Sequence, residues 1–173
     1  ELQLLPLHEI QQIAKDASLP FAIAIVNVSG DLNVGMLIRT AAVFGASQVY
    51  IFGRRKYDRR STVGAHHYVP IESYPNVPDD KSPFNWSNMI QLIYVNGWTP
   101  VVIEQGGAPL SDFQELTTPP PCLIFGPEDT GVPASVCETE KCYTIPQLGV
   151  LRSLNVAVAA GIAMHHVAGL AQR

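Results

Sequence analysis

Apolar residues follow two different spacings along the chain, and blocks of the two spacings alternate. Residues 7–17 carry apolar side chains at the spacing of one helical face, which predicts a first helix. Residues 21–28 form a near-continuous apolar run, which is typical of a strand covered on both faces. We expect further strands at residues 48–52, 68–71, 101–104, 122–125 and 142–145. We expect further helices at residues 33–44, 86–95, 110–116 and 153–171.

This alternation predicts an α/β fold, in which one parallel sheet carries helices on both faces. The length of 173 residues is that of one domain, so residues 1–173 are expected to form a single domain. The first residue is Glu1 rather than Met, and we expect the chain to be part of a longer or processed protein. Ligands of such sheets bind beyond the carboxyl ends of the strands. The loops expected at that edge comprise residues 27–35, 105–109, 126–133 and 146–155.

The composition is that of a globular chain, because 47% of the residues are hydrophobic and 15% are charged. No apolar run reaches the roughly 18–20 residues of a membrane span, so no membrane contact is expected, and neither is a signal peptide. The 3 cysteines cannot all pair within the chain, and no C-x-x-C spacing occurs. This pattern disfavours a disulfide scaffold and a zinc ribbon and favours a reducing compartment. We expect the cytoplasm, with the nucleus and organelles as alternatives.

The charge distribution is uneven. A formal net charge of −4 and an isoelectric point of about 5.7 argue against a general nucleic-acid binder. However, 5 of the 11 Lys and Arg residues lie within residues 54–60. They are Arg54, Arg55, Lys56, Arg59 and Arg60. Such a cluster is either a solvated loop or a loop that contacts phosphates.

Several common catalytic motifs are absent from the sequence. It contains no P-loop and no G-x-S-x-G nucleophile elbow. No G-x-G-x-x-G follows the first expected strand, which disfavours a nicotinamide enzyme and a Rossmann-type methyltransferase. Two histidine pairs occur, at residues 66–67 and 165–166. Adjacent residues on a helix diverge by about 100°, so neither pair faces one metal ion and no metal is expected.

Three motifs carry candidate chemistry, and the first spans residues 33–45 (NVGMLIRTAAVFG). Gly35 and Arg39 are four residues apart, so they share one helical face, and the glycine leaves open space before the arginine. Arg39 stands among apolar neighbours, and a buried guanidinium needs a partner or an anionic ligand. A structural salt bridge is the alternative explanation.

The second and third motifs follow expected strands. In residues 123–133 (LIFGPEDTGVP), a buried strand enters a glycine-framed turn that presents Glu128, although an ordinary turn has the same pattern. In residues 145–155 (IPQLGVLRSLN), a strand ends at a proline and an irregular loop follows. Ser153 and Asn155 then open a helix of small apolar residues, and a simple N-cap would account for Ser153.

Together and in this order, the three motifs resemble the RNA ribose 2′-O-methyltransferases of the SpoU (TrmH-type) branch of the SPOUT superfamily. The matching signatures are N-x-G-x-x-x-R-T-A-x-x-F-G, F-G-x-E-x-x-G and I-P-x-x-x-x-x-x-S-L-N, and the resemblance covers about residues 21–170. It implies a parallel α/β sheet with a C-terminal trefoil knot and a homodimer. It also implies S-adenosylmethionine (AdoMet) as methyl donor, no metal, and a ribose 2′-hydroxyl of tRNA or rRNA as acceptor.

The resemblance also implies roles for individual residues. The positions that match the family's catalytic and structural residues are Asn33, Arg39, Glu128, Ser153 and Asn155. The positions that match donor contacts are Ile103, Gly126, Ile145 and Ser153, with Leu148 and Leu154 as neighbours. The family's proposed base is the arginine, whereas the residues alone favour the carboxylate of Glu128, because an arginine pKa lies above about 12. We expect Arg39 to contact a phosphate and the hydroxyl, and to act as a base only in the assembled RNA complex. Glu128 and Asn33 are expected to orient Arg39 or the loop.

Two other functions fit the same motifs. One is a non-catalytic RNA-binding or dimerisation module, and the presence of Arg39, Ser153 and Asn155 argues for an enzyme instead. The other is a base methyltransferase of the related TrmD-type branch, which the intact pattern from Asn33 to Arg39 argues against. The basic residues Arg54, Arg55, Arg59 and Arg60 are the candidate RNA contacts. Residues 156–164 are apolar on all sides, and a groove beside Ala157 and Gly161 is expected to receive a second subunit, with a helix wholly buried within one subunit as the alternative.

Overall fold

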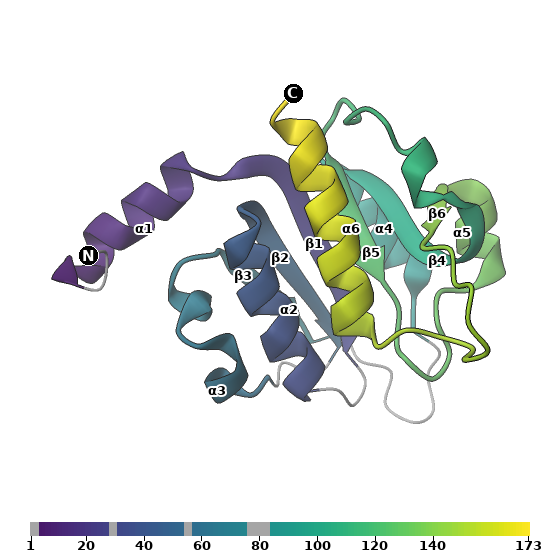
Figure 1. Ribbon diagram of the computed structural model, residues 1–173, viewed down its shortest axis with the longest axis horizontal. Coiled ribbons are helices and arrows are strands. Elements are labelled where there is room, and N and C mark those ends of the chain that lie inside the picture. The colour runs from purple at the N-terminus through teal and green to yellow at the C-terminus, as the bar shows by residue number, and fades with distance from the viewer. Residues whose placement is uncertain (1–3, 28–30, 54–56, 76–83) are drawn as a thin grey trace.

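The core of the fold is a six-stranded sheet with the strand order β3-β2-β1-β5-β4-β6. The computed structural model describes residues 4–27, 31–53, 57–75 and 84–173. All five strand pairs are parallel, as the sequence predicts (Figure 1). The strands are β1 (Leu19–Asn27), β2 (Ala46–Gly53), β3 (Ile71–Tyr74), β4 (Thr99–Pro109), β5 (Pro121–Phe125) and β6 (Lys141–Thr144).

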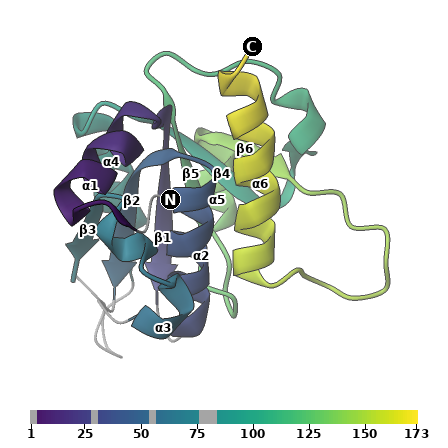
Figure 2. The same ribbon diagram turned by 60° about the vertical axis from the view of Figure 1, so that its left-hand side comes forward.

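Helices cover both faces of this sheet. They are α1 (Leu7–Asp16), α2 (Asp31–Val43), α3 (Arg59–Thr62), α4 (Trp86–Val95), α5 (Ala134–Thr139) and α6 (Val156–Ala171), with short 3-10 turns η2 (Ala65–His67) and η3 (Leu110–Asp112). Figure 2 shows α2 and α6 side by side in front of the sheet. Helix α1 has no buried residue and extends away from the sheet.

β1 is buried on both faces because its side chains alternate between two hydrophobic cores. Ile23 and Ile25 point into the core that α2 and α6 complete. Ala24 and Val26 point into the second core, which α4 and α5 close. A strand covered in this way has no polar face, which explains the near-continuous apolar run in the sequence.

The carboxyl ends of the strands bring three of the predicted loops to one edge of the sheet. β1 ends at Asn27 and β5 at Phe125, and the loop after β6 leads to the first turn of α6. Figure 1 shows this loop and the start of α6 at the same edge. The edge where the sequence predicts a ligand is therefore the edge where the candidate motifs meet.

Two helices begin at positions other than those predicted. α2 begins at Asp31, so Asn33 lies within its first turn and does not cap it. α6 begins at Val156, and its N-cap is Asn155 rather than Ser153. The Asn155 Oδ1 accepts the backbone N–H groups of Ala157 at 2.9 Å and Val158 at 3.3 Å. The simple N-cap explanation for Ser153 is therefore wrong.

Other boundaries also differ from the prediction. The third strand covers residues 71–74 rather than 68–71, because the N–H groups of Tyr68 and Val69 bond to the Ala65 carbonyl and close the turn η2. β4 continues past Glu104 to Pro109, with an irregularity between Ile103 and Ala108. The helix predicted at 110–116 is a single turn at η3, and α3 and α5 were not predicted.

Candidate active site

Asn155 joins the three motifs through hydrogen bonds. Its Nδ2 donates to Asn33 Oδ1 on α2 at 3.0 Å and to Glu128 Oε1 at 3.0 Å. Its Oδ1 accepts the two helix N–H groups described above. A primary amide has two donor hydrogens and one carbonyl oxygen, so every polar group of this side chain is used. The amide therefore has one favoured orientation, with oxygen toward α6 and nitrogen toward Glu128.

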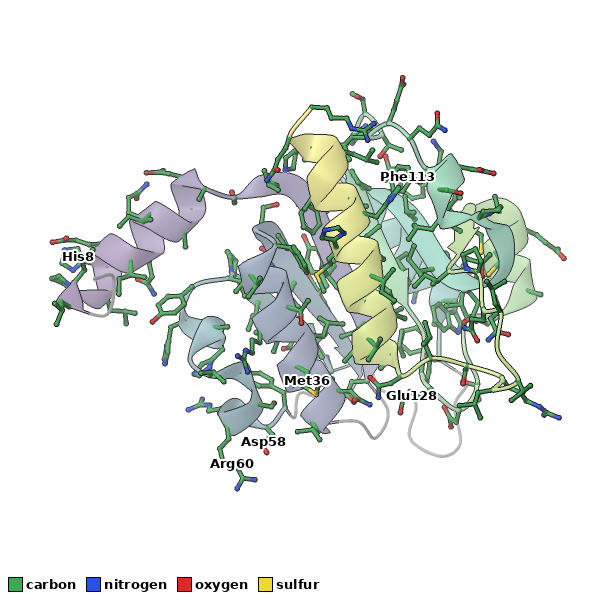
Figure 3. The ribbon with its side chains drawn as sticks, in the orientation of Figure 1. His8, Met36, Asp58, Arg60, Phe113 and Glu128 are labelled. Atoms are coloured by element: carbon green, nitrogen blue, oxygen red, sulfur yellow. The ribbon has the colours of Figure 1, made fainter. Side chains whose placement is uncertain are left out.

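Glu128 lies at the N-terminal end of α6, as Figure 3 shows. Its Oε1 accepts the backbone N–H of Val156 at 3.2 Å as well as the Asn155 amide. The partial positive charge of the helix N-terminus stabilises a carboxylate at this position. Since Oε1 takes both bonds, Oε2 has no hydrogen-bond partner in the described part of the chain. One carboxylate oxygen thus holds the network, and the other is available to a ligand.

A cavity of about 390 Å³ opens beside this network. Its volume falls within the roughly 300–1,000 Å³ of small-molecule sites. Among the predicted donor contacts, five line it: Ile103, Gly126, Ile145, Ser153 and Leu154. Leu148 does not, because its side chain is 98% exposed in the loop before α6. The structure therefore brings together all but one of the residues predicted to contact a donor.

The cavity wall also contains residues that the sequence analysis missed. Glu104 of β4 lines the cavity, and its Oε2 accepts the Val132 N–H at 2.8 Å. The amide of the neighbouring Gln105 donates to the carbonyl of Arg152, which ties β4 to the loop before α6. No sequence motif marks these contacts, because the residues they join are 28 and 47 positions apart.

Gly126 is required by the close approach of the loop after β5. A Cβ atom at this position would lie 2.6 Å from the carbonyl carbon of Gly131 and 2.8 Å from the nitrogen of Val132. Both contacts involve backbone atoms, which cannot turn away as a side chain can. The glycine therefore allows the loop that presents Glu128 to fold back over the end of β5.

A second cavity of about 290 Å³ also borders Glu128. Its walls include Asn27 of β1 and Asn33 of α2. It shares Gly126, Glu128 and other residues with the first cavity, so both open onto the same carboxylate. Two ligands could therefore contact Glu128, one from each cavity.

Arg39 stands apart from both cavities. It lies on the exposed side of α2 and makes no hydrogen bond or ion pair to any residue that the structure describes. The prediction of a buried guanidinium is wrong, and so is the structural salt bridge. The space beside Gly35 is not open either, because a Cβ there would collide with Ser61 and lie 2.7 Å from the Asp58 carbonyl oxygen. Gly35 instead allows α2 to pack against the segment of α3.

The predicted basic loop is described only in part. Arg54 and Arg55 lie outside the described residues, and Arg59 is exposed on α3. Arg60 forms an ion pair with Asp58, with 3.0 Å between Nη2 and Oδ2, and both side chains project from the body of the fold (Figure 3). The hydrogen bonds from Arg60 lower the pKa of the Asp58 carboxyl. The charge of Arg60 is thus partly balanced, whereas Arg59 has no carboxylate partner among the described residues.

The outer surfaces of α2 and α6 are apolar. Met36 and Val43 on α2 are 41% and 72% exposed, and Val158 and Ile162 on α6 are 48% and 40% exposed. Arg39 lies on the same side of α2 as Met36. The groove predicted beside Ala157 and Gly161 is filled within the chain, because Ala157 is buried and a Cβ atom added at Gly161 would lie 3.6 Å from the Thr40 methyl group of α2.

The described residues contain no group of three or more His, Cys, Asp and Glu side chains that could hold a metal ion. None of the helices in this part of the chain combines the length and apolar character needed to cross a bilayer.

Comparisons with known proteins agree with the motifs. The sequence matches the SpoU rRNA Methylase family over residues 20–165. A similar protein is the 23S rRNA (guanosine(2553)-2'-O)-methyltransferase RlmP of Bacillus subtilis, which is 32% identical over 146 residues, covering 79% of this chain and 53% of the relative. The chain spans about half the length of several curated bacterial relatives.

Solved structures give the same result for the fold. The A. aeolicus TrmH/SpoU tRNA modifying enzyme superposes with a TM-score of 0.77 at 21% identity, covering 96% of this chain and 82% of that chain. The AdoMet-bound rRNA methyltransferase from Sinorhizobium meliloti gives a TM-score of 0.70 at 25% identity, covering 88% of this chain and 58% of that chain. Because the family match covers most of the sequence, this chain belongs to the SpoU rRNA methylase family.

Proposed function

We propose that this chain transfers a methyl group from AdoMet to a ribose 2′-hydroxyl of tRNA or rRNA. The observation that carries the proposal is the network of Asn33, Glu128 and Asn155, which lies beside a cavity lined by the predicted donor contacts. The names of the Bacillus subtilis and A. aeolicus relatives, an rRNA 2′-O-methyltransferase and a tRNA modifying enzyme, support this acceptor class. The AdoMet-bound relative from Sinorhizobium meliloti supports the donor.

The cavity of about 390 Å³ is the proposed donor site. In this proposal, backbone groups at Gly126 and Ile145 hydrogen-bond the adenine edge, and the side chains of Ile103 and Leu154 cover the ring. We expect the chain to form its trefoil knot here, with the loops of residues 126–133 and 145–155 threaded through each other.

The second cavity, which also borders Glu128, is the proposed site of the acceptor ribose. The donor carries the methyl group on a sulfonium sulfur. The methyl group moves in line to the hydroxyl oxygen as its bond to sulfur breaks. The chain's task is then to hold the two ligands in line and to receive the hydroxyl proton. Asn155 fixes the position of Glu128, whose free Oε2 is available to the hydroxyl, and Ser153 lies at the rim of the donor cavity.

Arg39 is the proposed contact for a phosphate of the RNA and for the hydroxyl. It does not line the cavity of its own chain, so a second subunit is needed to bring it to the reaction. We propose a homodimer through the apolar outer faces of α2 and α6, with Arg39 of one subunit beside the cavity of the other. The exposed residues Leu148 and Leu151, 98% and 82% exposed, would be covered in the same assembly.

Sedimentation tests the dimer. The pair Val158→Glu with Ile162→Glu places two charges on the proposed interface and is expected to give monomers that no longer transfer methyl groups. Val95→Glu, at an α4 residue that is 79% exposed, is the matched control and is expected to remain dimeric. Sedimentation of the unchanged chain as a monomer at micromolar concentration would contradict the dimer, and so would an active monomeric variant.

Donor binding and transfer are tested separately. Titration calorimetry with AdoMet is expected to show binding both to the unchanged chain and to Arg39→Ala, because Arg39 does not line the donor cavity. Transfer to RNA is expected to fall at least 100-fold in Arg39→Ala and to be unchanged in the control Arg173→Ala, at the exposed end of the chain. Donor binding by the unchanged chain without any transfer would instead indicate a non-catalytic module. We propose a cytoplasmic location for this enzyme. We also propose that residues 1–173 form a single catalytic domain.

A further inference from the structure

A third cavity, of about 850 Å³, lies between α1 and the turn η2. Its walls include Ala46, Ser47 and Ile71, which stand at the beginnings of β2 and β3. It therefore opens at the amino edge of the sheet, opposite the edge that carries Glu128. We propose that this cavity, the flank pocket, binds an unpaired nucleotide of the RNA substrate away from the methylated ribose. This inference rests on the RNA substrate of the proposed function.

Aromatic and imidazole rings form one wall of the flank pocket. They belong to Tyr57, His66, His67 and Tyr68. The ring centroids of His66 and His67 are 4.0 Å apart, and that of Tyr57 is 6.1 Å from His66. Flat rings gathered in this way are the surfaces on which unpaired bases stack, and they accept any base because every base has a flat face.

His66 of the flank pocket is hydrogen-bonded to Thr62. The Thr62 hydroxyl donates to the Arg59 carbonyl at 2.8 Å, so its oxygen is left to accept from His66 Nδ1 at 2.6 Å. Burial lowers the pKa of His66, and the charges of His67 and Arg59 lower it further. Donation through Nδ1 requires the ring proton on that nitrogen, and the lowered pKa favours the neutral ring. Its Nε2 is then a hydrogen-bond acceptor, which suits an amino group on a base edge.

The charge of the flank pocket suits a phosphate. Lys15 of α1 lines it, and no Asp or Glu is among its wall residues. Lys15 forms no ion pair with any residue that the structure describes, while the adjacent Asp16 accepts from Gln12 at 2.7 Å. On a chain of net charge −4, a large cavity without a carboxylate is a local exception. A lysine without a counterion suits the phosphate of a nucleotide, and the stacking rings beside it suit the base.

The chain itself links the flank pocket to the catalytic edge. After β2 ends, it forms α3 at that edge and then returns through η2 toward the amino edge (Figure 1). Arg59 of α3 is exposed and is near enough to His66 to affect its charge. An RNA strand that leaves the acceptor site along this flank would meet Arg59 first and the rings afterwards.

Photocrosslinking and affinity measurements on the unchanged chain test the flank pocket. The probe is a single-stranded RNA of ten nucleotides that carries 5-iodouridine, with no donor present. We expect crosslinks in the segment of residues 57–70. We also expect His67→Ala to weaken RNA binding at least fivefold, while His67→Phe, which keeps a flat ring, retains it.

Charge variants supply the matched control. Lys15→Glu is expected to weaken RNA binding at least fivefold and to reduce the slope of log affinity against log salt by roughly one. Lys141→Glu makes the same charge change at an exposed residue of β6, away from the flank pocket, and is expected to bind as the unchanged chain does.

Three outcomes would overturn the flank pocket. The first is that His67→Ala binds RNA as tightly as the unchanged chain. The second is that crosslinks are confined to other segments. The third is that uridine monophosphate binds to the pocket while these variants leave RNA affinity unchanged. Failure of the proposed function looks different. It would appear as absent transfer with intact RNA binding, because the RNA measurements contain no donor.

Discussion

Replacing Asn155 with alanine is the perturbation that the structure defines most completely. The side chain joins the start of α6 to Asn33 and Glu128 through the hydrogen bonds described above. Asn155→Ala removes both the N-cap of α6 and the links to the other two motifs. Two separable losses of folding free energy are therefore expected.

The size of each loss follows from the contacts. Loss of an asparagine N-cap costs about 1 kcal/mol. The two bonds from Nδ2 join exposed side chains, and water replaces them in the variant, so about 0.5 kcal/mol each is appropriate. The sum is about 2 kcal/mol of unfolding free energy. For a domain of this length, that corresponds to a decrease in Tm of about 4–8 °C.

Urea unfolding at one fixed protein concentration measures this loss, since a dimer makes stability depend on concentration. Asn155→Ser is the matched variant, because serine caps a helix but is too short to bridge to Asn33 and Glu128. We expect it to regain about 1 kcal/mol relative to Asn155→Ala, while methyl transfer stays low in both variants. A loss below about 0.5 kcal/mol in Asn155→Ala, or equal losses in the two variants, would refute this reasoning.

Three further substitutions test the packing around the site. Gly126→Ala places a Cβ against backbone atoms of the loop after β5, and we expect calorimetry to show loss of AdoMet binding. Gly35→Ala collides with Ser61 and is expected to lower Tm in a thermal melt, whereas AdoMet affinity per folded molecule stays unchanged; unchanged Tm would contradict the close approach. Glu104→Gln weakens the bond to the Val132 N–H and is expected to reduce AdoMet affinity by about tenfold; affinity equal to that of the unchanged chain would exclude a role for this carboxylate.

The sheet and most of its elements could be predicted because their signals are local. Residues 86–95 form α4 as predicted, with Asn85 as its cap and Gly97 in a left-handed conformation after its end. The order of strands and helices was enough to predict one parallel sheet. The start of β3 after η2 was not predictable. It depends on the backbone N–H groups of Tyr68 and Val69, which bond to the Ala65 carbonyl in the turn instead of to a neighbouring strand.

The position of Arg39 shows a limit of reasoning from neighbours in the sequence. Apolar residues on both sides indicated burial, yet Leu37 and Ile38 face the core while Met36 on the other side is 41% exposed. Helix α2 is apolar on two sides, and which side is buried depends on how the helix packs against the sheet. The same holds for Ala157 and Gly161, whose groove is filled by α2 rather than by another chain.

The site was predictable as a set of residues but not as a set of contacts. The motifs indicated Asn33, Glu128 and Asn155, and the structure joins them directly. The roles of Asn33 and Asn155 depended on helix starts at Asp31 and Val156, which no local pattern distinguished from starts two or three residues away.

The most direct test of the account is methyl transfer from AdoMet labelled on its methyl group to unmodified tRNA and rRNA transcripts. After transfer, the RNA is digested to nucleosides and the labelled nucleoside is identified by chromatography and mass spectrometry. The account predicts that the label is in a 2′-O-methylnucleoside and that Arg39→Ala yields none while still binding donor. Label in a methylated base, or full transfer by the donor-saturated Arg39→Ala variant, would contradict it.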